Sequence, residues 1–475
     1  MSKTQKIFLF AISGLAGLLV LVALTLLLVV DVNAHKPRLE AAASAALGME
    51  VKVGGRLRLG FFPGLLVKLE DVHIRNRGME VASAKDTWLW VDILPLFRQE
   101  VRIGKIALIQ PRISIERGLD GNYNIEKPEK AGGTIPALDL VGITVADGTL
   151  RYTNKQSGEG FETGHCRLDV DRLRHSGGKS QDFMKHISIK AELACEEIRI
   201  KDITVSDLKL SVNGKNAVYE IKPVTMQVFG GPGTGSIQAD YSGAVPRYHV
   251  QYSLSRFNIE EFVMTLSPQK VAEGPMDLAA TLTMQGRSVS DMLQTADGEI
   301  SLRGENLILI GNNIDKKLSR YESSQNFNLV DVGAFFFAGP IGLVATKGYN
   351  FASIFQGSGG RSEIRMFVSG WHVERGVAQA LDVAMATNKN RIALRGGLDF
   401  VNQRFNDVTV AVIDAKGCAK AQQKIRGSFQ KPEVESPNIL KSLTGPARTL
   451  LKKGRELLPD GECKVFYAGS VMPPK

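Results

Sequence analysis

The chain has 475 residues, a net charge of +10 at pH 7 and a hydrophobic share of 44%, and this hydrophobic content excludes a generally disordered protein. Its length also excludes one ordinary compact core, so two domains or a repeat array are expected. The 48 glycines and the low aromatic share of 7% favour many short strands joined by tight turns.

The first expected element is an unbroken apolar run over residues 7–30, preceded by Lys3 and Lys6. At about 1.5 Å per residue, a helix of this length crosses a hydrocarbon core of about 30 Å. A secretory apolar region usually has only about 7 to 15 residues, which favours an uncleaved signal anchor. Cleavage after Ala34 remains the alternative. The lysines predict a cytoplasmic N-terminus and place the rest of the chain across the membrane.

The next element is a short helix over residues 35–47, with Pro37 near its start and Gly48 as its stop. From there, apolar residues alternate with mostly polar ones, which predicts strands with one apolar face. Trp88 and Trp90 share one face of such a strand and Leu89 lies on the other, so either face could be the apolar one. The clearest alternating residues are candidates to line that face: Met276, Leu278, Leu282, Met284, Ile364, Met366, Val368, Val408, Val410 and Val412.

An internal repeat is present in residues 101–115, 138–152 and 198–212, whose apolar positions coincide without gaps. Within each copy the apolar spacing slips by one residue and then continues past a turn-like gap. Such a slip moves side chains to the opposite face unless a bulge or bend absorbs it. Each copy is therefore expected to be a bent strand followed by another, with one apolar side. Its candidate lining residues are Ile106, Leu108, Ile113, Ile115, Ile203, Val205, Leu208 and Leu210.

Two later segments differ from this pattern. Residues 329–344 are strongly apolar and predict a buried or membrane-skimming element, with a core helix favoured. Residues 439–458 carry leucines among cations and predict either amphipathic helices on a bilayer or, as the favoured form, a helix capping the sheet. Residues 416–455 form a basic tract with ten Lys or Arg against two Asp or Glu. The anchor makes nucleic acid an unexpected partner for this tract, and a solvated face is the alternative to a lipid surface. The candidate membrane-surface cations are Lys441, Arg448, Lys452, Lys453 and Arg455.

All four cysteines follow the anchor, in what is expected to be an oxidising compartment. Four cysteines allow three pairings, and we predict the two local ones. Cys166 and Cys195 end strand-like stretches that a hairpin could bring side by side, and Cys418 and Cys463 flank the basic tract. In the chain-entropy model each such bridge stabilises the fold by roughly 3.5 to 4 kcal/mol.

The sequence carries no nucleophile elbow, no H-E-x-x-H pair and no phosphate-binding loop, so neither an enzyme nor a cofactor is expected. The glycine-rich residues 230–235 lack a following lysine and are expected to form a turn. His165, Cys166, His175 and His186 crowd one region, but their spacing matches no zinc pattern, so no metal is expected.

The stretches 57–76 and 87–126 resemble the AsmA family of bacterial envelope proteins, in the positions of Pro63, Pro95 and Pro111 and in a Gly121-Asn122 turn. Residues 224–241, 284–304, 417–427 and 463–474 resemble its later repeats and ending. The resemblance covers nearly the whole chain. It implies an N-terminal anchor (1–34), an AsmA-like helix and β-repeat (35–130), middle repeats (131–270) and a C-terminal β-region (271–475).

The resemblance implies a mainly β fold: an elongated, curled repeat sheet that forms an apolar groove, with one transmembrane helix and a few short helices. It also implies a single-pass inner-membrane protein with its bulk in the periplasm, which binds or conducts phospholipid between the two membranes. The alternative is a non-catalytic scaffold that works with the outer-membrane assembly machinery by binding strands at a sheet edge. Neither function requires a small-molecule substrate.

Overall fold

The computed structural model describes residues 32–60, 64–92, 95, 102–125, 134–135, 138–179, 184–265, 272–311, 313–316, 318–319, 360–429, 431–435, 438–439 and 463–474. Within these residues, no helix is long and apolar enough to cross a bilayer. The predicted anchor, the apolar segment 329–344 and the basic segment from residue 440 onward, with its five candidate cations, lie outside the described residues. So do the predicted domain boundaries after residues 130 and 270.

The chain divides into two compact units, which are residues 1–217 and 218–475. The described part of unit 1 begins with a short 3-10 helix, η1 (Val32–His35), and the helix α2 (Lys36–Leu47). The helix predicted over residues 35–47 is thus confirmed. Gly48 ends it with a φ of 69°, which favours glycine, and its N–H donates to the carbonyl of Ser44 at 2.8 Å.

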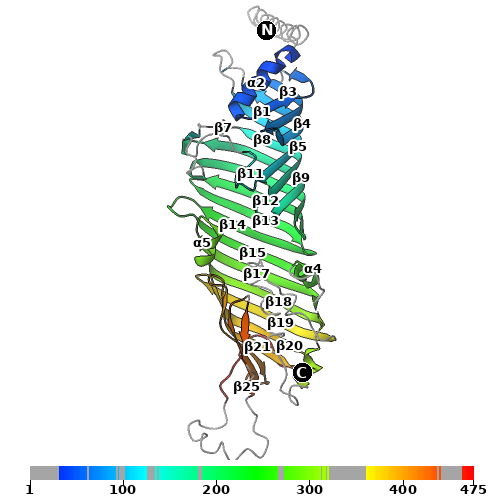
Figure 1. The fold of residues 1–475 in the computed structure, drawn as a ribbon, viewed down its shortest axis with the longest axis vertical. Coiled ribbons are helices and arrows are strands. Elements are labelled where there is room, and N and C mark those ends of the chain that lie inside the picture. Colours follow the sequence, from blue (N-terminus) through cyan, green and yellow to red (C-terminus); the bar gives the residue numbers. More distant parts are fainter. Residues whose placement is uncertain are drawn as a thin grey trace, which may run out of the picture. The chain divides into compact units, whose positions relative to one another are not determined.

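The sheet of unit 1 is antiparallel apart from one parallel pair (Figure 1). β1 and β2 both pair with β3, and β4, β5, β8, β9, β11 and β12 follow in that order. β5 and β8 are the parallel pair. The short strand β7, which precedes β8 in the chain, pairs with the C-terminal end of β9. A separate ribbon joins β6 to β10. The strands are β1 (Glu50–Val53), β2 (Leu57–Gly60), β3 (Leu65–Asn76), β4 (Met79–Val91), β5 (Ile103–Arg117), β6 (Thr134–Ile135), β7 (Leu138–Leu140), β8 (Gly142–Asn154), β9 (Glu159–His175), β10 (Gly178–Lys179), β11 (Ile187–Ile200) and β12 (Ile203–Lys215).

The three repeat copies bend at the same position of their frame. Gln110, Asp147 and Asp207 occupy this position in β5, β8 and β12, with φ values of 49°, 57° and 52°. A residue in this conformation bends the strand locally, so the apolar residues on either side of the turn-like gap stay on one face. The gap is therefore a bend within one strand and not a turn between two strands. The predicted slip lies earlier in the frame: the first copy has a bulge there, at Gly104, whereas the second passes from β7 to β8 and the third turns from β11 to β12.

In unit 2, successive strands pair antiparallel in the order β13, β14, β15, β17, β18, β19, β20, β21, β22 and β23. Short strands extend this series: β16 pairs with β18, and β24 and β25 pair with β23. The elements are β13 (Val218–Val228), β14 (Gly231–Asp240), β15 (Arg247–Asn258), α4 (Ile259–Met264), β16 (Ala272–Glu273), β17 (Pro275–Gln285), α5 (Val289–Gln294), β18 (Asp297–Ile310), β19 (Arg361–Glu374), β20 (Val377–Thr387), β21 (Arg391–Asp399), β22 (Arg404–Ile413), β23 (Ala419–Gly427), β24 (Pro432–Val434) and β25 (Asn438–Ile439).

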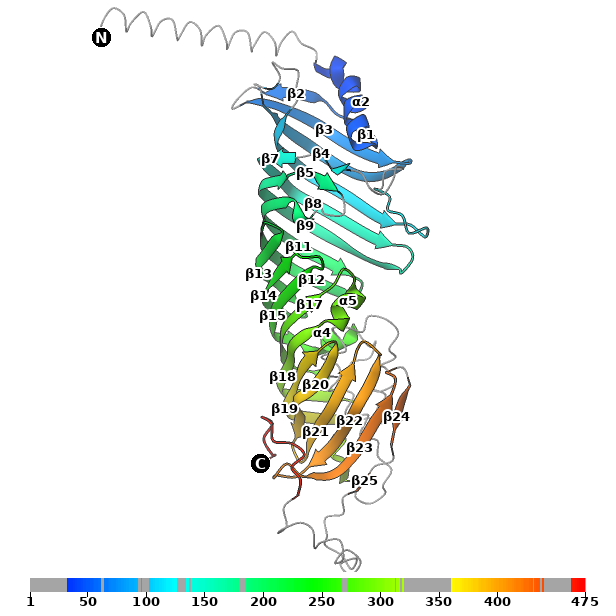
Figure 2. The same ribbon diagram turned by 90° about the vertical axis from the view of Figure 1, so that its left-hand side faces the viewer.

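The fold class predicted from the sequence is confirmed at this level: the chain is mainly β, its sheet is curled and unclosed, and the helices are few and short (Figure 2). One local prediction needs correction. The glycine-rich stretch 230–235 is a turn only at its start, where Phe229 and Gly230 have φ values of 51° and 72°. From Gly231 it is strand β14. Glycine is needed there because a Cβ on Gly233 would collide with the phenol of Tyr252, and a Cβ on Gly235 would collide with the carbonyl oxygen of Gln251.

Both predicted disulfides are present, Cys166–Cys195 and Cys418–Cys463. Cys166 lies directly opposite Cys195 in the register of β9 and β11. The second bridge ties the C-terminal segment 463–474 to the end of β22 and the start of β23. This segment packs on β19–β22 through a cluster of buried side chains: Val368, Ala384, Ala386, Ala393, Ala411, Ile413, Tyr467 and Val471.

Candidate functional site

The apolar residues of unit 1 form transverse rows that run from strand to strand. In one row, Leu69 lies opposite Thr87, Thr87 opposite Leu108, and Leu108 beside Val145. The row continues through Leu168 and Leu193 to Leu210. We call the surface made by such rows the apolar face of unit 1. A second row contains Val67, Leu89, Ile106, Ile143, Val170, Ala191 and Val212, and a third Ile74, Ala82, Ile113, Leu150, Thr163, Ile198 and Val205.

Most side chains of this face are only half-buried. Neighbouring strands cover their flanks, and α2 covers the face at one end, where Ala43 packs against Val51, Val53 and Val72 (Figure 2). Among the described residues, the candidates Ile106, Leu108, Ile113, Ile115, Ile203, Val205 and Leu210 are half-buried on this face, and Leu208 is buried opposite Cys195. Half-buried aliphatic side chains in register over successive strands form an apolar surface that a ligand can cover.

The opposite face of unit 1 is polar. Trp88 and Trp90 lie on it, and Lys68 and Lys105 place their ammonium groups 5.7 Å and 5.3 Å from the two indole ring centres. Lys68 also pairs with Asp86 at 3.3 Å. This resolves which face of β4 belongs to the apolar side: Leu89 lies between Val67 and Ile106, whereas the half-buried tryptophans lie against lysines on the other face.

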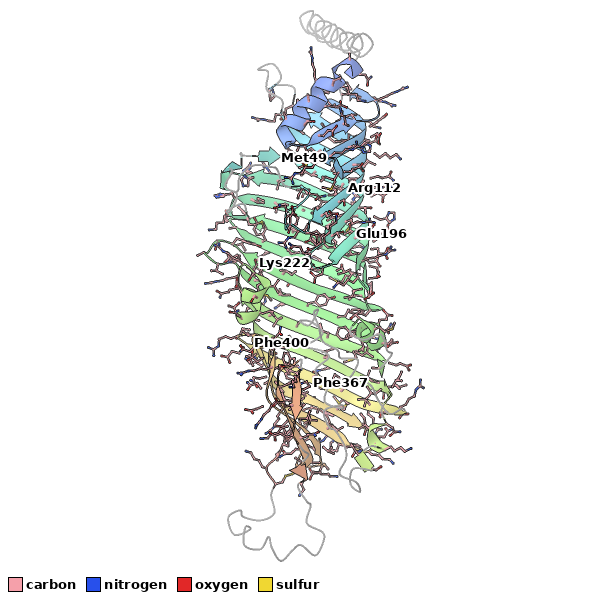
Figure 3. The ribbon with its side chains drawn as sticks, viewed as in Figure 1. Met49, Arg112, Glu196, Lys222, Phe367 and Phe400 are labelled. Carbon is pink, nitrogen blue, oxygen red and sulfur yellow. A yellow bond between two sulfur atoms is a disulfide. The ribbon has the colours of Figure 1, made fainter. Side chains whose placement is uncertain are left out.

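The positive-φ residues Gln110, Asp147 and His165, in the neighbouring strands β5, β8 and β9, are joined by polar contacts. Gln110 Nε2 donates to Asp147 Oδ2 at 2.9 Å, and His165 Nδ1 lies 2.6 Å from Asp147 Oδ1. The hydrogen bond from Gln110, followed by that from His165, lowers the pKa of Asp147. The same carboxylate raises the pKa of His165. All three side chains are exposed, like the charged Arg112 and Glu196 (Figure 3). These contacts therefore join the bends of neighbouring strands at the surface.

We expect Asp147→Asn to lower the pKa of His165, because the amide removes the negative charge that stabilises the imidazolium. The measurement is an NMR titration of the imidazole in the full chain. Asp169→Asn is the control, because Asp169 pairs with Arg167 and not with His165. An unchanged His165 titration in the Asp147 variant would show that this contact does not exist in solution.

The candidate lining residues of unit 2 divide into two groups. Leu282 and Met284 are half-buried, and Leu282 continues a row with Ile237 and Val250. Six other candidates are packed in a core and present no free apolar surface. Val408 and Val410 among them are 0% exposed. The other packed residues are Met276, Leu278, Ile364 and Val412.

The prediction that Ile364, Met366 and Val368 share one face is wrong. Ile364 pairs with Thr387 and Met366 with Ala386, so a bulge at Arg365 puts the first two on opposite faces. Met366 and Val368 instead pack beneath the C-terminal segment. Their sequence alternates perfectly, so it contains no signal for this bulge.

The histidine-rich region of unit 1 does not converge. Cys166 is in the disulfide, His165 bonds Asp147, and the rings of His175 and His186 lie 6.1 Å apart. Within the described ranges no three His, Cys, Asp or Glu side chains are grouped so as to hold a metal ion. The repeat frame placed Val145 of β8 on the apolar side, but sequence reasoning missed Leu168 of β9 and Leu193 of β11 as lining residues. Their alternation is the signal that was available, although the bulge at His165 interrupts it.

The geometry can now be compared with known proteins. The AsmA family model matches residues 1–181 and 178–336. The chain belongs to the AsmA family. No curated protein and no solved structure matches it. The two matched regions of this AsmA protein contain the strands from β1 to β18, and strands β19–β23 lie beyond them.

Proposed function

We propose that this AsmA-family protein binds the acyl chains of phospholipids along the apolar face of unit 1 and conducts lipid between the inner and outer membranes. The observation that carries the proposal is the set of half-buried aliphatic rows that continue in register from β3 to β12. The family membership and the curled, open β-sheet fit a bridge-like lipid transport protein.

An acyl chain can both bind to the apolar face and move along it. Each methylene that leaves water for the apolar face contributes about 0.8 kcal/mol. The rows are chemically similar from strand to strand, so a chain that slides by one row exchanges one set of aliphatic contacts for another. The headgroup can stay in water throughout. Movement along such a face therefore needs no catalytic group, which agrees with the expectation that the protein is not an enzyme.

The location is part of the same proposal. The two disulfides favour an oxidising compartment, and the apolar run at residues 7–30 is expected to anchor the chain in the inner membrane with its bulk in the periplasm. The proposed partners are phospholipid and the inner membrane.

The first edge of the sheet argues against the strand-binding alternative at that position. The outward N–H groups of Val51 and Val53 in edge strand β1 donate to Ser44 Oγ and Glu40 Oε1 of α2, both at 2.8 Å. The N–H of Leu57 in β2 donates to Asn33 Oδ1 at 3.0 Å. An incoming strand needs such donors free. This edge is therefore closed by side chains, whereas most described side chains of the apolar face are half-buried.

The experiment is site-specific photo-crosslinking in the full membrane-bound chain. A photoreactive residue at Leu168, on the apolar face, is expected to capture phospholipid. The same residue at Arg167, which is next to it and on the polar face, is expected to capture little. Equal lipid capture at the two positions, or capture of protein alone at Leu168, would contradict the proposal.

A further inference from the structure

A polar hollow lies on the side of the unit 2 sheet opposite the Leu282 row. Two transverse rows of three strands line it: Gln238, His249 and Thr283 in one, and Asp240, Arg247 and Gln285 in the other. Its volume is about 260 Å³, and Thr295, between α5 and β18, closes one side. We call it the β14–β17 pocket. Its size suits a small polar molecule.

Hydrogen bonds between loops fix the wall of the pocket. Thr295 Oγ1 accepts from the N–H of Gln285 at 2.8 Å and donates to the carbonyl of Gln285. Arg287 donates to the carbonyl of Ala244 at 2.9 Å, which joins the end of β17 to the loop before β15. Ser288 and Asp291 form a capping box that fixes the start of α5. These bonds join the loops that form the wall of the pocket.

The pocket holds two opposite charges, Asp240 and Arg247, on neighbouring strands. Within the described part of the chain, neither the guanidinium of Arg247 nor the imidazole of His249 forms a hydrogen bond or an ion pair. Asp240 Oδ1 accepts from the N–H and the hydroxyl of Ser242 at 2.8 Å and 2.6 Å. These bonds and, less strongly, the charge of Arg247 lower the pKa of Asp240, so its carboxylate is anionic and its second oxygen can accept from a ligand.

The charges select the kind of ligand. An anion alone would gain from Arg247 but would be repelled by Asp240 on the neighbouring strand, and a cation alone would meet the reverse. A molecule with both charges satisfies both groups. We propose that the β14–β17 pocket binds a small zwitterion, with its oxyanion at Arg247 and His249 and its ammonium group at Asp240. A phosphorylated amino alcohol, free or as a lipid headgroup, is the class that fits. This inference does not rest on the proposed function.

Titration calorimetry of the full chain with O-phosphoethanolamine tests the inference, with inorganic phosphate and ethanolamine as single-charge probes. We expect phosphoethanolamine to bind at least tenfold more tightly than either probe. Arg247→Gln is expected to weaken its binding at least tenfold. Asp240→Asn keeps an oxygen for Ser242, and it is expected to reduce phosphoethanolamine binding to the level of phosphate. Arg303→Gln, on β18 outside the pocket, is the matched control and is expected to bind as the unsubstituted chain does.

A second arm separates the two sources of the ligand. The protein is sedimented with vesicles that contain phosphatidylethanolamine and phosphatidylglycerol, or with vesicles of phosphatidylglycerol alone. If Arg247→Gln weakens binding only to the vesicles that contain phosphatidylethanolamine, the ligand is a lipid headgroup. Saturation by soluble phosphoethanolamine without this vesicle dependence identifies a free molecule. Phosphate binding as tight as phosphoethanolamine binding, or unchanged binding after Arg247→Gln and in a second variant, His249→Ala, would overturn the inference.

Discussion

Replacing Leu168 and Leu210 together by arginine is expected to reduce the phospholipid bound to the purified protein by more than tenfold. The two leucines belong to one transverse row of the apolar face, with Leu193 between them. Two guanidinium groups in this row would have to lose water under an acyl chain or hold the chain away from the sheet. A loss of only about 1.4 kcal/mol in binding free energy is already tenfold in affinity.

The substitution should leave the fold intact, because both leucines are half-buried and an arginine stem can lie along an apolar surface with its charge in water. Lipid extraction followed by mass spectrometry measures the bound phospholipid. Ser206→Arg is the matched control: Ser206 lies next to Val205 on the polar face of the same strand and pairs with Glu197. Circular dichroism checks that the double variant is folded. An unchanged amount of bound phospholipid in a folded double variant would contradict lipid binding at the apolar face.

Disconnecting the C-terminal segment is expected to destabilise unit 2 by several kcal/mol. Tyr467 is buried on β19–β22, and its hydroxyl donates to Asp382, which also accepts from Ser470 Oγ at 2.6 Å. Burial, together with Asp382, raises the pKa of Tyr467, so the phenol stays protonated. Arg391 donates to the carbonyl of Val471 at 2.9 Å. Truncating a buried aromatic side chain costs about 3 to 5 kcal/mol, so Tyr467→Ala should have this effect.

The disulfide contributes independently at the other end of the segment. Replacing Cys418 and Cys463 by serine opens a loop with a sequence separation of 45, which costs roughly 4 kcal/mol in the chain-entropy model. The probe is Trp371, which is buried in β19 and is the tryptophan of unit 2. Denaturant unfolding is followed by its fluorescence in a Trp88→Phe, Trp90→Phe background. Leu381→Ala is the control, because this side chain is 64% exposed beside Asp382. Midpoints that coincide for all variants would show that the segment does not stabilise the unit.

The repeat frame of unit 1 was accessible from the sequence because apolar spacing records which side chains share a face. The slip in that frame predicted a bulge or bend, which the first copy forms at Gly104, and the turn-like gap is a bend at Gln110, Asp147 and Asp207. The two disulfides were predictable for a related reason: a hairpin places Cys166 and Cys195 opposite each other, so local pairing suffices.

Pairings between distant segments were not predictable in this way. The parallel contact of β5 with β8 depends on a long connection, and nothing in the alternation of either strand specifies its partner. The β14–β17 pocket takes its side chains from three strands and a loop, so no local motif marks it. Burial also depends on what covers a strand. Val145 and Val410 are both valines on the apolar side of their strands, yet the first is half-buried and the second fully buried.

The most direct measurement is a cryo-electron microscopy map of the full chain purified with its native lipids. We expect elongated density along the apolar face of unit 1, in contact with the row from Leu108 to Leu210. This density should belong to acyl chains and not to the polypeptide. A map in which the protein's own residues fill that face from β3 to β12 would contradict it.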